Sequence, residues 1–380
     1  MRLAAVAIAL FLVWFLQGLF FRKFWNRGLE VFLDFQQTAA VEGETAALKE
    51  VIVNRKFLPL PVLHVKFQMG RELVFTDTEG SHITDRNYRS DIFSCMPWQE
   101  IRRRLEFVCR KRGYYVIRSA DLVSYDLFQT GHFVSSVPAF TWMYVYPGPA
   151  DPLRLQLPLQ NLLGQVLARQ ALLRDPFEVQ SVRPYQSYDS YRDINWKATA
   201  HTGSMKVHVY APTSSWRVMF LLDVESDRIW EDADLTEEAI RLCGSMAGQL
   251  LKEGIPVSIC SNGLDCLSGK PSFLEAGAGA GHQTAVMETL ARIQLTAAGR
   301  LSMEELLRQL SARPSDLENS LFVLLSPVQR EELAAAYGDF CAGSPGSQWI
   351  LPLRPGERPR FDHLSGNLSL FPWEVPYDRS

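Results

Sequence analysis

Three acidic residues alternate directly after an apolar run in the second half of the chain. The run Arg217–Asp223 (RVMFLLD) predicts a buried strand, and Asp223, Glu225 and Asp227 stand at its end. Carboxylate oxygens are the ligands that a hard cation such as Mg²⁺ prefers, and a bound metal ion could activate water for hydrolysis. The alternative is an acidic loop that faces solvent or a basic partner. The loop is therefore a candidate metal site, with a metal-dependent hydrolase as the activity it would serve.

A second group of polar and aromatic residues lies in a segment that reads RPYQSYDSYRDINWKATAHTGSMKV, from Arg183 to Val207. Trp196 has a large apolar ring with one N–H donor, which predicts a buried side chain with a satisfied hydrogen bond. Arg183 carries a planar fork of donors that could hold a carboxylate or a cluster of carbonyl groups. Asp189 and Arg192 are three residues apart and could pair with each other or bind backbone groups across a loop. The candidate binding residues of this segment are Arg183, Tyr185, Asp189, Arg192, Trp196 and Lys197.

The segment has two interpretations that involve no catalysis. Its polar network could clamp a β domain to an α/β domain, or it could form a surface that binds a partner. We find no HExxH or paired zinc-ligand spacing, no GxSxG, no Walker A sequence and no GxGxxG after a strand. The glycine-rich stretch 275–282 lacks the Lys-Ser/Thr of a phosphate loop and is interpreted as a flexible connector. We therefore expect no enzyme and no cofactor, apart from Mg²⁺ if the acidic loop binds it.

The composition excludes some classes of protein. The chain has 380 residues with 39 basic and 42 acidic side chains and a formal net charge of −3, so it lacks the basic excess that nucleic-acid binding needs. Its six cysteines form no CxxC pair, which favours buried thiols in a reducing compartment. Cys260 and Cys266 are close enough in sequence to form a disulfide as the alternative.

The N-terminal region predicts a single membrane span. Residues 3–21 contain no charged side chain, and at ~1.5 Å per residue they reach about 28 Å, the thickness of a hydrocarbon core. A retained anchor is favoured over a cleaved signal peptide, because no small-residue cleavage site follows, and over a buried core helix, because every face is apolar. Arg22, Lys23 and Arg27 outnumber the charges before the span and place the bulk of the chain in the cytoplasm. Trp25 is predicted to anchor the end of the span at the membrane interface.

The soluble part is predicted to contain two domains. Short alternating segments separated by turn residues predict a small β-sandwich over residues 28–150. Its expected strands are Leu29–Phe35, Leu48–Asn54, Leu63–Met69, Ile101–Arg110 and Gly113–Ser119. The basic clusters 102–104 and 110–112 are interpreted as solvated strand faces, or as a contact with anionic lipid head groups.

From residue 216 the pattern changes to strands that alternate with helices, which predicts a parallel sheet covered by helices on both faces. The expected strands are Arg217–Asp223, Pro256–Cys260, Leu321–Ser326 and Trp349–Leu353, and the expected helices are Leu235–Leu251, Ala285–Ile293, Ser302–Leu310 and Gln329–Tyr337. The predicted domains are a membrane anchor (1–27), the β-sandwich (28–150), a segment with a connecting helix at 157–172 followed by mixed polar and aromatic residues (151–215), the α/β domain (216–353) and a tail that wraps onto a domain (354–380).

The segment Arg183–Val207 resembles the signature of the domain-of-unknown-function 58 family (DUF 58), approximately R-x-Y-x-x-G-D-x-x-R-x-I-x-W-x-x-S/T-A-R. The matching positions are Arg183, Tyr185, Asp189, Arg192, Ile194, Trp196, Thr199 and Ala200, whereas Tyr188 and His201 replace the usual glycine and arginine. With flanking phrases such as Val145-Tyr146-Pro147, the resemblance spans roughly residues 1–353. It implies a membrane-anchored protein with a β domain and a von Willebrand factor A-like (vWA-like, Rossmann-type) domain, which works beside a MoxR-type AAA+ ATPase and other membrane proteins.

The resemblance also bears on the acidic loop. Such vWA-like domains commonly bind Mg²⁺ through D-x-S-x-S after the first strand; here Asp223 fits, Glu225 and Asp227 replace the serines, and Ser326 stands where a later aspartate is expected. We therefore predict a single-pass cell-membrane protein that scaffolds the assembly or maturation of envelope-associated complexes. The metal-dependent hydrolase is the alternative.

Overall fold

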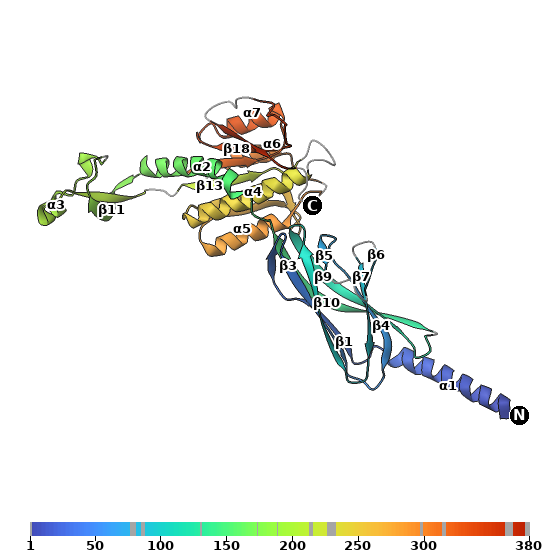
Figure 1. Cartoon of the computed structure of the whole chain (residues 1–380). Coiled ribbons are helices and arrows are strands. Elements are labelled where there is room, and N and C mark those ends of the chain that lie inside the picture. Colours follow the sequence, from blue (N-terminus) through green and yellow to red (C-terminus); the bar gives the residue numbers. More distant parts are fainter. Residues whose placement is uncertain are drawn as a thin grey trace. The chain divides into compact units, whose positions relative to one another are not determined.

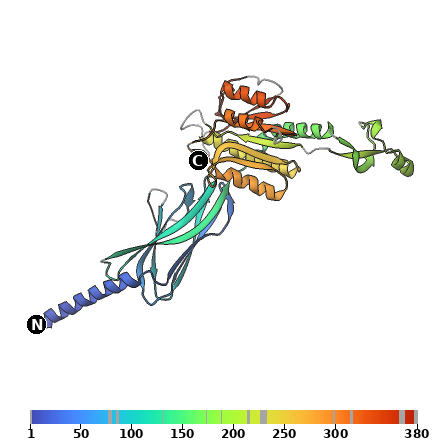
Figure 2. The same ribbon diagram turned by 180° about the vertical axis from the view of Figure 1, so that it is seen from behind.

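The chain divides into two compact units, Met1–Gly148 and Pro149–Ser380 (Figures 1 and 2). The computed structural model describes residues 2–76, 81–84, 88–129, 131–172, 174–187, 189–212, 216–225, 233–296, 299–313, 317–361 and 368–376. It is a mixed α/β structure with several sheets and an apolar N-terminal helix, as the sequence predicts at that level.

Helix α1 (Arg2–Phe24) opens the first unit. Its segment Val6–Phe24 is long and apolar enough to cross a membrane, and it is the one such helix among the described residues. Phe21 and Trp25 are only 1% and 4% exposed, because both pack against Phe133 in the core of the first unit, with ring centroids 5.8 and 6.3 Å apart. The Trp25 ring is therefore not exposed as an interfacial anchor would be; it is buried in protein and joins the helix to the β-rich fold.

Among the described residues of the first unit, ten strands follow α1. They are β1 (Leu29–Phe35), β2 (Ala39–Val41), β3 (Thr45–Asn54), β4 (Leu60–Gln68), β5 (Leu73–Phe75), β6 (Ser81–Thr84), β7 (Tyr88–Cys95), β8 (Glu100–Cys109), β9 (Gly113–Tyr125) and β10 (His132–Tyr146). They form a four-stranded sheet, β1-β3-β8-β5, and a six-stranded sheet, β2-β10-β9-β4-β7-β6. Side chains from both sheets form one core, as in a β-sandwich. The five predicted strands are all present.

Alternation explains why these segments form strands. In β1 the side chains of Leu29, Val31, Leu33 and Phe35 are buried, since successive residues of a strand point to opposite faces. Strand β10 has the same alternation near its end, but its first half carries serines and Pro138 beside a bulge. That mixture hides a strand of 15 residues from a search for apolar alternation.

The core of the first unit also holds a cluster of charged side chains from β3, β7 and β8. Asp91 is fully buried and accepts hydrogen bonds from Arg89 (2.8 and 3.1 Å) and Arg103 (3.2 Å). Glu50 is 1% exposed, and neither oxygen of its carboxyl group has a hydrogen-bond partner among the described residues. Burial, and then the charge of Asp91, raises the pKa of Glu50 to about 8. The prediction that residues 102–104 form a solvated face is thus wrong for Arg103.

We predict that Glu50→Gln removes a pH dependence of stability. Because the folded-state pKa of Glu50, about 8, lies above its ordinary value of 4.5, the folded chain keeps a proton that the unfolded chain loses in this window. Glu50 therefore lowers the wild-type unfolding free energy as pH rises from 4.5 to 8. We expect the difference between variant and wild type to grow by roughly 2–4 kcal/mol across that range, measured by urea unfolding. The exposed Glu106→Gln should show no such trend; a constant difference for Glu50→Gln would contradict the prediction.

The second unit begins with helix α2 (Pro152–Leu172), whose predicted extent started at 157, and the paired strands β11 (Arg174–Pro184) and β12 (Lys206–Pro212). The remaining strands are β13 (Arg217–Leu222), β14 (Val257–Asp265), β15 (Pro271–Gly277), β16 (Ile293–Gln294), β17 (Ser320–Leu325), β18 (Gln348–Leu353) and β19 (Ser369–Glu374). The helices between them are α4 (Ala233–Lys252), α5 (Ala280–Arg292), α6 (Met303–Ser311) and α7 (Glu331–Phe340).

These strands form one sheet in the order β15-β14-β13-β17-β18-β19, with β16 beside β14. The pairs β14-β13, β13-β17, β17-β18 and β18-β19 are parallel. Strands β15 and β16 are antiparallel to β14, so the predicted parallel sheet is a mixed one.

Helices cover both faces of this sheet, as predicted (Figure 1). Alternate residues of β13 divide between two cores: Phe220 packs with α4 and α5, and Leu221 with α6 and α7. Strands buried on both faces are apolar throughout, which is why β13 and β17 can be recognised in the sequence.

One connecting segment differs from its prediction, and part of the tail packs onto a domain as predicted. The glycine-rich stretch 275–282 is no flexible connector: it contains the end of β15 and the start of α5, and a ring nitrogen of His282 lies 2.7 Å from the carbonyl oxygen of Val257. Within the predicted tail, β19 extends the sheet, and Trp373 donates from its indole nitrogen to Glu238 at 3.1 Å.

Candidate functional site

The signature segment folds as an antiparallel pair of strands with two short helices between them. Strands β11 and β12 pair from Val182–His208 to Pro184–Lys206, and the connection contains η1 (Tyr191–Asp193) and α3 (Trp196–Thr202). Asn195 caps α3 by accepting a hydrogen bond from the backbone N–H of Ala198 at 2.8 Å. Gly203 ends the helix in the left-handed region, with φ of 65°. Capping residues thus determine where α3 begins and ends, in a segment for which the sequence predicted only a mixture of polar and aromatic residues.

An ion pair fixes the start of the connection. Arg183 holds Asp189 through two hydrogen bonds, at 2.7 and 2.5 Å, in the parallel geometry that makes arginine–carboxylate pairs strong. The same carboxylate accepts from the backbone N–H of Gln186 at 2.8 Å, which closes the turn. The prediction that Arg183 holds a carboxylate is confirmed. Of the two alternatives for Asp189, binding to a backbone group is confirmed, whereas pairing with Arg192 is wrong, because Arg183 occupies the carboxylate and Arg192 is exposed.

The aromatic rings of the segment lie at the surface. Trp196 is 66% exposed and Tyr191 is 71% exposed, so the predicted burial of Trp196 is wrong. The physical reason is that α3, a helix of seven residues on a two-stranded ribbon, buries none of its residues. Tyr185 stacks on Tyr191 with centroids 5.8 Å apart, and Lys197 is exposed beside Trp196. Tyr191, Arg192, Trp196 and Lys197 together are called the signature face below.

We predict that Asp189→Asn loosens the connection while the sheet stays folded. The amide keeps the size of the side chain but loses the charge-assisted pair with Arg183, a contribution of about 1.5–3 kcal/mol. Amide hydrogen exchange at Gln186 should therefore become at least about tenfold faster. Arg192→Gln, which changes the charge of an exposed side chain nearby, is the matched control. Unchanged protection in Asp189→Asn would show that the ion pair does not hold the turn.

The predicted metal site lies where the chain leaves β13. Asp223 is fully buried, and its carboxylate accepts hydrogen bonds from the backbone N–H of Glu225 (2.9 Å), from Asn262 (2.7 Å) and from Ser326 (2.7 Å). Burial raises the pKa of Asp223, and these donors oppose that shift. Asn262 comes from β14 and Ser326 directly follows β17, so the ends of three neighbouring strands meet at one carboxylate. Ser326 thus completes a hydrogen-bond network at the position where a second acid was expected.

An arginine neutralises the next acid of the loop. Arg330 forms an ion pair with Glu225 and lies 3.6 Å from Glu304, so one guanidinium lies between two carboxylates. Burial raises the pKa of Glu225, with Arg330 acting in the opposite direction. Asp227 lies outside the described residues. Among the described residues no three acidic, histidine or cysteine side chains are grouped to hold a metal ion. Mg²⁺ binding at Asp223, Glu225 and Asp227 stays a prediction.

Arg330, Glu304 and Asn262 were missed in the sequence. Asn262 lies within the buried part of β14, two residues after Cys260, and could have been found by asking which polar side chains directly follow an apolar run. Arg330 precedes α7, more than a hundred positions from Glu225, and no local pattern connects the two.

We predict that Arg330→Gln destabilises the second unit, because Glu225 and Glu304 would keep their charges without the guanidinium. We expect a loss of about 1–3 kcal/mol in urea unfolding. Arg308→Gln is the matched control, since Arg308 is 72% exposed and pairs with Glu305 one helical turn away, where such pairs contribute little. Equal effects of the two changes would contradict the role given to Arg330.

The predicted metal site can be tested by titration calorimetry with Mg²⁺. Binding heat that is present in the wild type and abolished by Asp223→Ala would establish the site.

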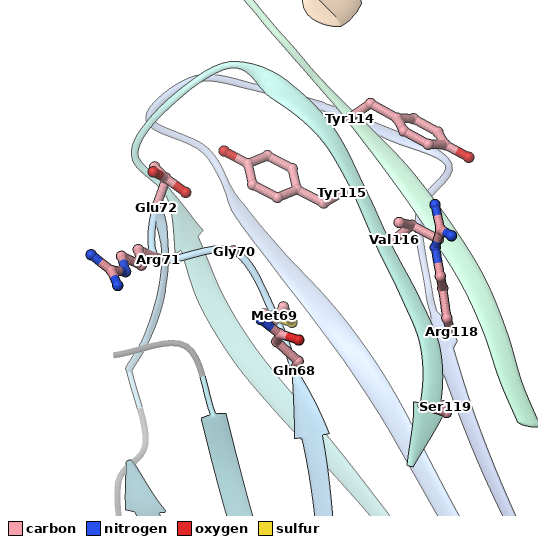
Figure 3. Close-up of a pocket in the computed structure, with 10 residues that line it drawn as sticks. All are labelled: Gln68, Met69, Gly70, Arg71, Glu72, Tyr114, Tyr115, Val116, Arg118 and Ser119. Carbon is pink, nitrogen blue, oxygen red and sulfur yellow. The ribbon is translucent and has the colours of Figure 1, made fainter. Parts of the chain in front are cut away.

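The first unit has a surface cavity of about 460 Å³. Figure 3 shows its lining residues on both sides of β9, with Tyr115 over Gly70 and Arg118 on the opposite side of the strand. A Cβ atom at residue 70 would lie 2.4 Å from the Tyr115 ring, so a larger residue there would require that ring to move. The polar groups do not converge on one point, and the cavity suggests no reaction.

The fold and the site define a mixed α/β protein with an N-terminal apolar helix and a surface-exposed signature. Residues 181–357 match the model of the family described as Protein of unknown function DUF58. The match includes the whole signature and the sheet as far as β18, and it supports the family that the motif resembles.

No curated protein matches the chain. Solved structures with similarity include the cohesin CaCohA2 from Clostridium acetobutylicum, which is 13% identical, with 30% of this chain and 90% of that chain covered and a TM-score of 0.23. The seventh ScaB type I cohesin from Pseudobacteroides cellulosolvens is 10% identical, with 32% and 95% covered and a TM-score of 0.22. A non-cellulosomal cohesin from Archaeoglobus fulgidus is 12% identical, with 30% and 91% covered and a TM-score of 0.21. At these TM-scores the similarities carry no argument.

Proposed function

We propose that this protein is a membrane-tethered interaction protein that binds another protein through its signature face. The observation that carries the proposal is the combination of exposed aromatic and cationic side chains with an ordered backbone. Trp196 and Tyr191 are more than half exposed, whereas the residues that hold them in place are paired, capped or stacked.

Protein interfaces obtain most of their binding energy from a few residues, and tryptophan, tyrosine and arginine are enriched among them. The signature face offers all three within six positions, from Tyr191 to Trp196. The Arg183–Asp189 pair and the Asn195 cap order this face before binding, which reduces the entropy lost on association. A clamp between two parts of the chain is the other interpretation.

The tether in this proposal is α1. Its apolar length suits a single span, and Arg22, Lys23 and Arg27 at its end favour a cytoplasmic location for the rest of the chain. The six cysteines are free thiols and five are buried, which suits a reducing compartment.

The second unit supports a vWA-like interpretation. In its sheet, β14 lies on one side of β13 and β17 on the other, so the chain reverses its direction of winding between β13 and β17. Open α/β sheets bind ligands at the carboxyl ends of strands at such a point. Asp223 and Ser326 lie there and bond each other. The family resemblance then suggests a MoxR-type AAA+ ATPase as partner, in the assembly or maturation of envelope complexes. No observation favours the hydrolase, because Arg330 already balances the charge of Glu225.

We predict that Trp196→Ala weakens binding of the full chain to the MoxR-type ATPase of the same cell by at least about tenfold, since truncating a central aromatic residue costs 1.4 kcal/mol or more. The measurement is co-purification from detergent extract followed by biolayer interferometry. Phe140→Ala is the matched control, because Phe140 is 72% exposed on β10 in the other unit. Equal binding by both variants, or no binding of the ATPase by wild type, would refute the proposed function.

A further inference from the structure

Four loops of the first unit lie at the end of the β-sandwich from which α1 emerges. The strand registers place them there: Leu29 at the start of β1 pairs with Asn54, Leu60 pairs with Cys95, and Tyr125 pairs with His132. The loops therefore contain residues 25–28, 55–59, 96–99 and 126–129. We call this the helix-proximal end.

Large apolar side chains are exposed in three of these loops. Phe57 is 83% exposed, Met96 61%, Trp98 70%, Leu127 47% and Phe128 58%, and these five residues are called the apolar rim. The described loops at the opposite end, at residues 36–38, 42–44, 69–72 and 110–112, expose no large apolar side chain. Among the described loops of the sandwich, the exposed large apolar side chains therefore lie at one end; on the strands, Phe32, Val134 and Phe140 are exposed as well.

The backbone at Trp98 adds to this contrast. Its φ of 57° is in the left-handed region, which costs free energy for a residue with a large side chain. An indole held outward in that way suits a boundary between an apolar phase and water, where tryptophan is enriched.

One hydrogen bond gives the height of the rim along α1. Gln17 donates to Asp126 at 3.3 Å, so the β9–β10 turn that carries Leu127 and Phe128 lies beside Gln17. Figures 1 and 2 both show this end of the sandwich beside the C-terminal part of α1, from which the rest of the helix extends away from the sandwich. Gln17 precedes Arg22 by five residues, or about 7 Å at the helical rise of ~1.5 Å. If Arg22 marks the membrane surface, Leu127 and Phe128 reach below it.

Basic side chains surround the same end. Arg22, Lys23, Arg27 and Arg55 are exposed there, and Lys23 and Arg27 lie over the ring of Phe24 at 5.8 and 5.2 Å. Cations above apolar side chains match the order of a lipid leaflet, with phosphate groups outside and acyl chains within.

We propose that the apolar rim inserts into the lipid leaflet that α1 enters, with the basic residues at the head-group phosphates. The proposal rests on the tether of the proposed function. We propose lipid as the partner because the rim lies beside α1 at the level of Gln17, and a membrane-spanning helix is surrounded by lipid at that level. The β-sandwich is then seated on the bilayer by its loops, which fixes its direction relative to the membrane.

The test uses full-length chain with Cys266→Ser, reconstituted into vesicles of phosphatidylcholine and phosphatidylglycerol. Single cysteines placed by Phe57→Cys, Phe128→Cys, Phe140→Cys and Leu12→Cys carry an NBD fluorophore, which is quenched by lipid with a nitroxide near the head group or by aqueous iodide. We expect lipid quenching at 57, 128 and 12 to exceed that at the strand control 140 by about twofold or more.

Each other outcome overturns part of the account. If lipid quenches the label at position 12, but quenches the labels at positions 57 and 128 no more than the control label at 140, then the tether is supported and insertion of the rim is refuted. No lipid quenching at any position refutes both. Protection of 57 and 128 from iodide without lipid quenching would mean that protein covers the rim, which also refutes the proposal.

Discussion

The burial of Phe21 and Trp25 in the core of the β-sandwich is the contact on which the rest of this account depends. An apolar helix joined by a flexible linker would leave the soluble part free to tumble. Here two aromatic side chains, each contributing roughly 1.5–3 kcal/mol when fully buried, make the end of the helix part of a folded unit. In the proposed membrane-tethered protein, α1 therefore determines how the first unit meets the membrane, and its neighbouring loops acquire a lipid-facing role.

The second constraint is that buried and half-buried carboxyl groups need a cation or hydrogen-bond donors beside them. Asp189 is held by an arginine fork, Asp223 by three hydrogen-bond donors, and Glu225 by a guanidinium. In each case the acid is used to hold loops together, and its charge is already balanced or solvated by donors. Such acids suit a scaffold better than a hydrolytic site, which needs a carboxylate free to act on metal or water.

Sequence patterns predict this fold where burial alone determines the pattern. Strands β13 and β17 and helix α4 are recognisable because strands covered on both faces are apolar throughout and a core helix repeats every three to four residues. The exposure of Trp196 could not be predicted, since an apolar residue type does not show whether a second layer covers it. The hydrogen-bond partners of Asp223 could not be predicted either, because Asn262 and Ser326 lie 39 and 103 residues away in the sequence. Contacts of that range depend on strand order, which one sequence does not contain.

The state of the N-terminal segment in the mature protein tests the central claim most directly. Membranes from cells that make the full chain can be washed with alkaline carbonate, and the intact mass of the protein determined in both fractions. The account predicts that the chain stays in the membrane pellet with residues 2–24 present. Release into the supernatant of a chain that begins after Phe21 would contradict it, because the helix that joins the β-sandwich to lipid would be missing.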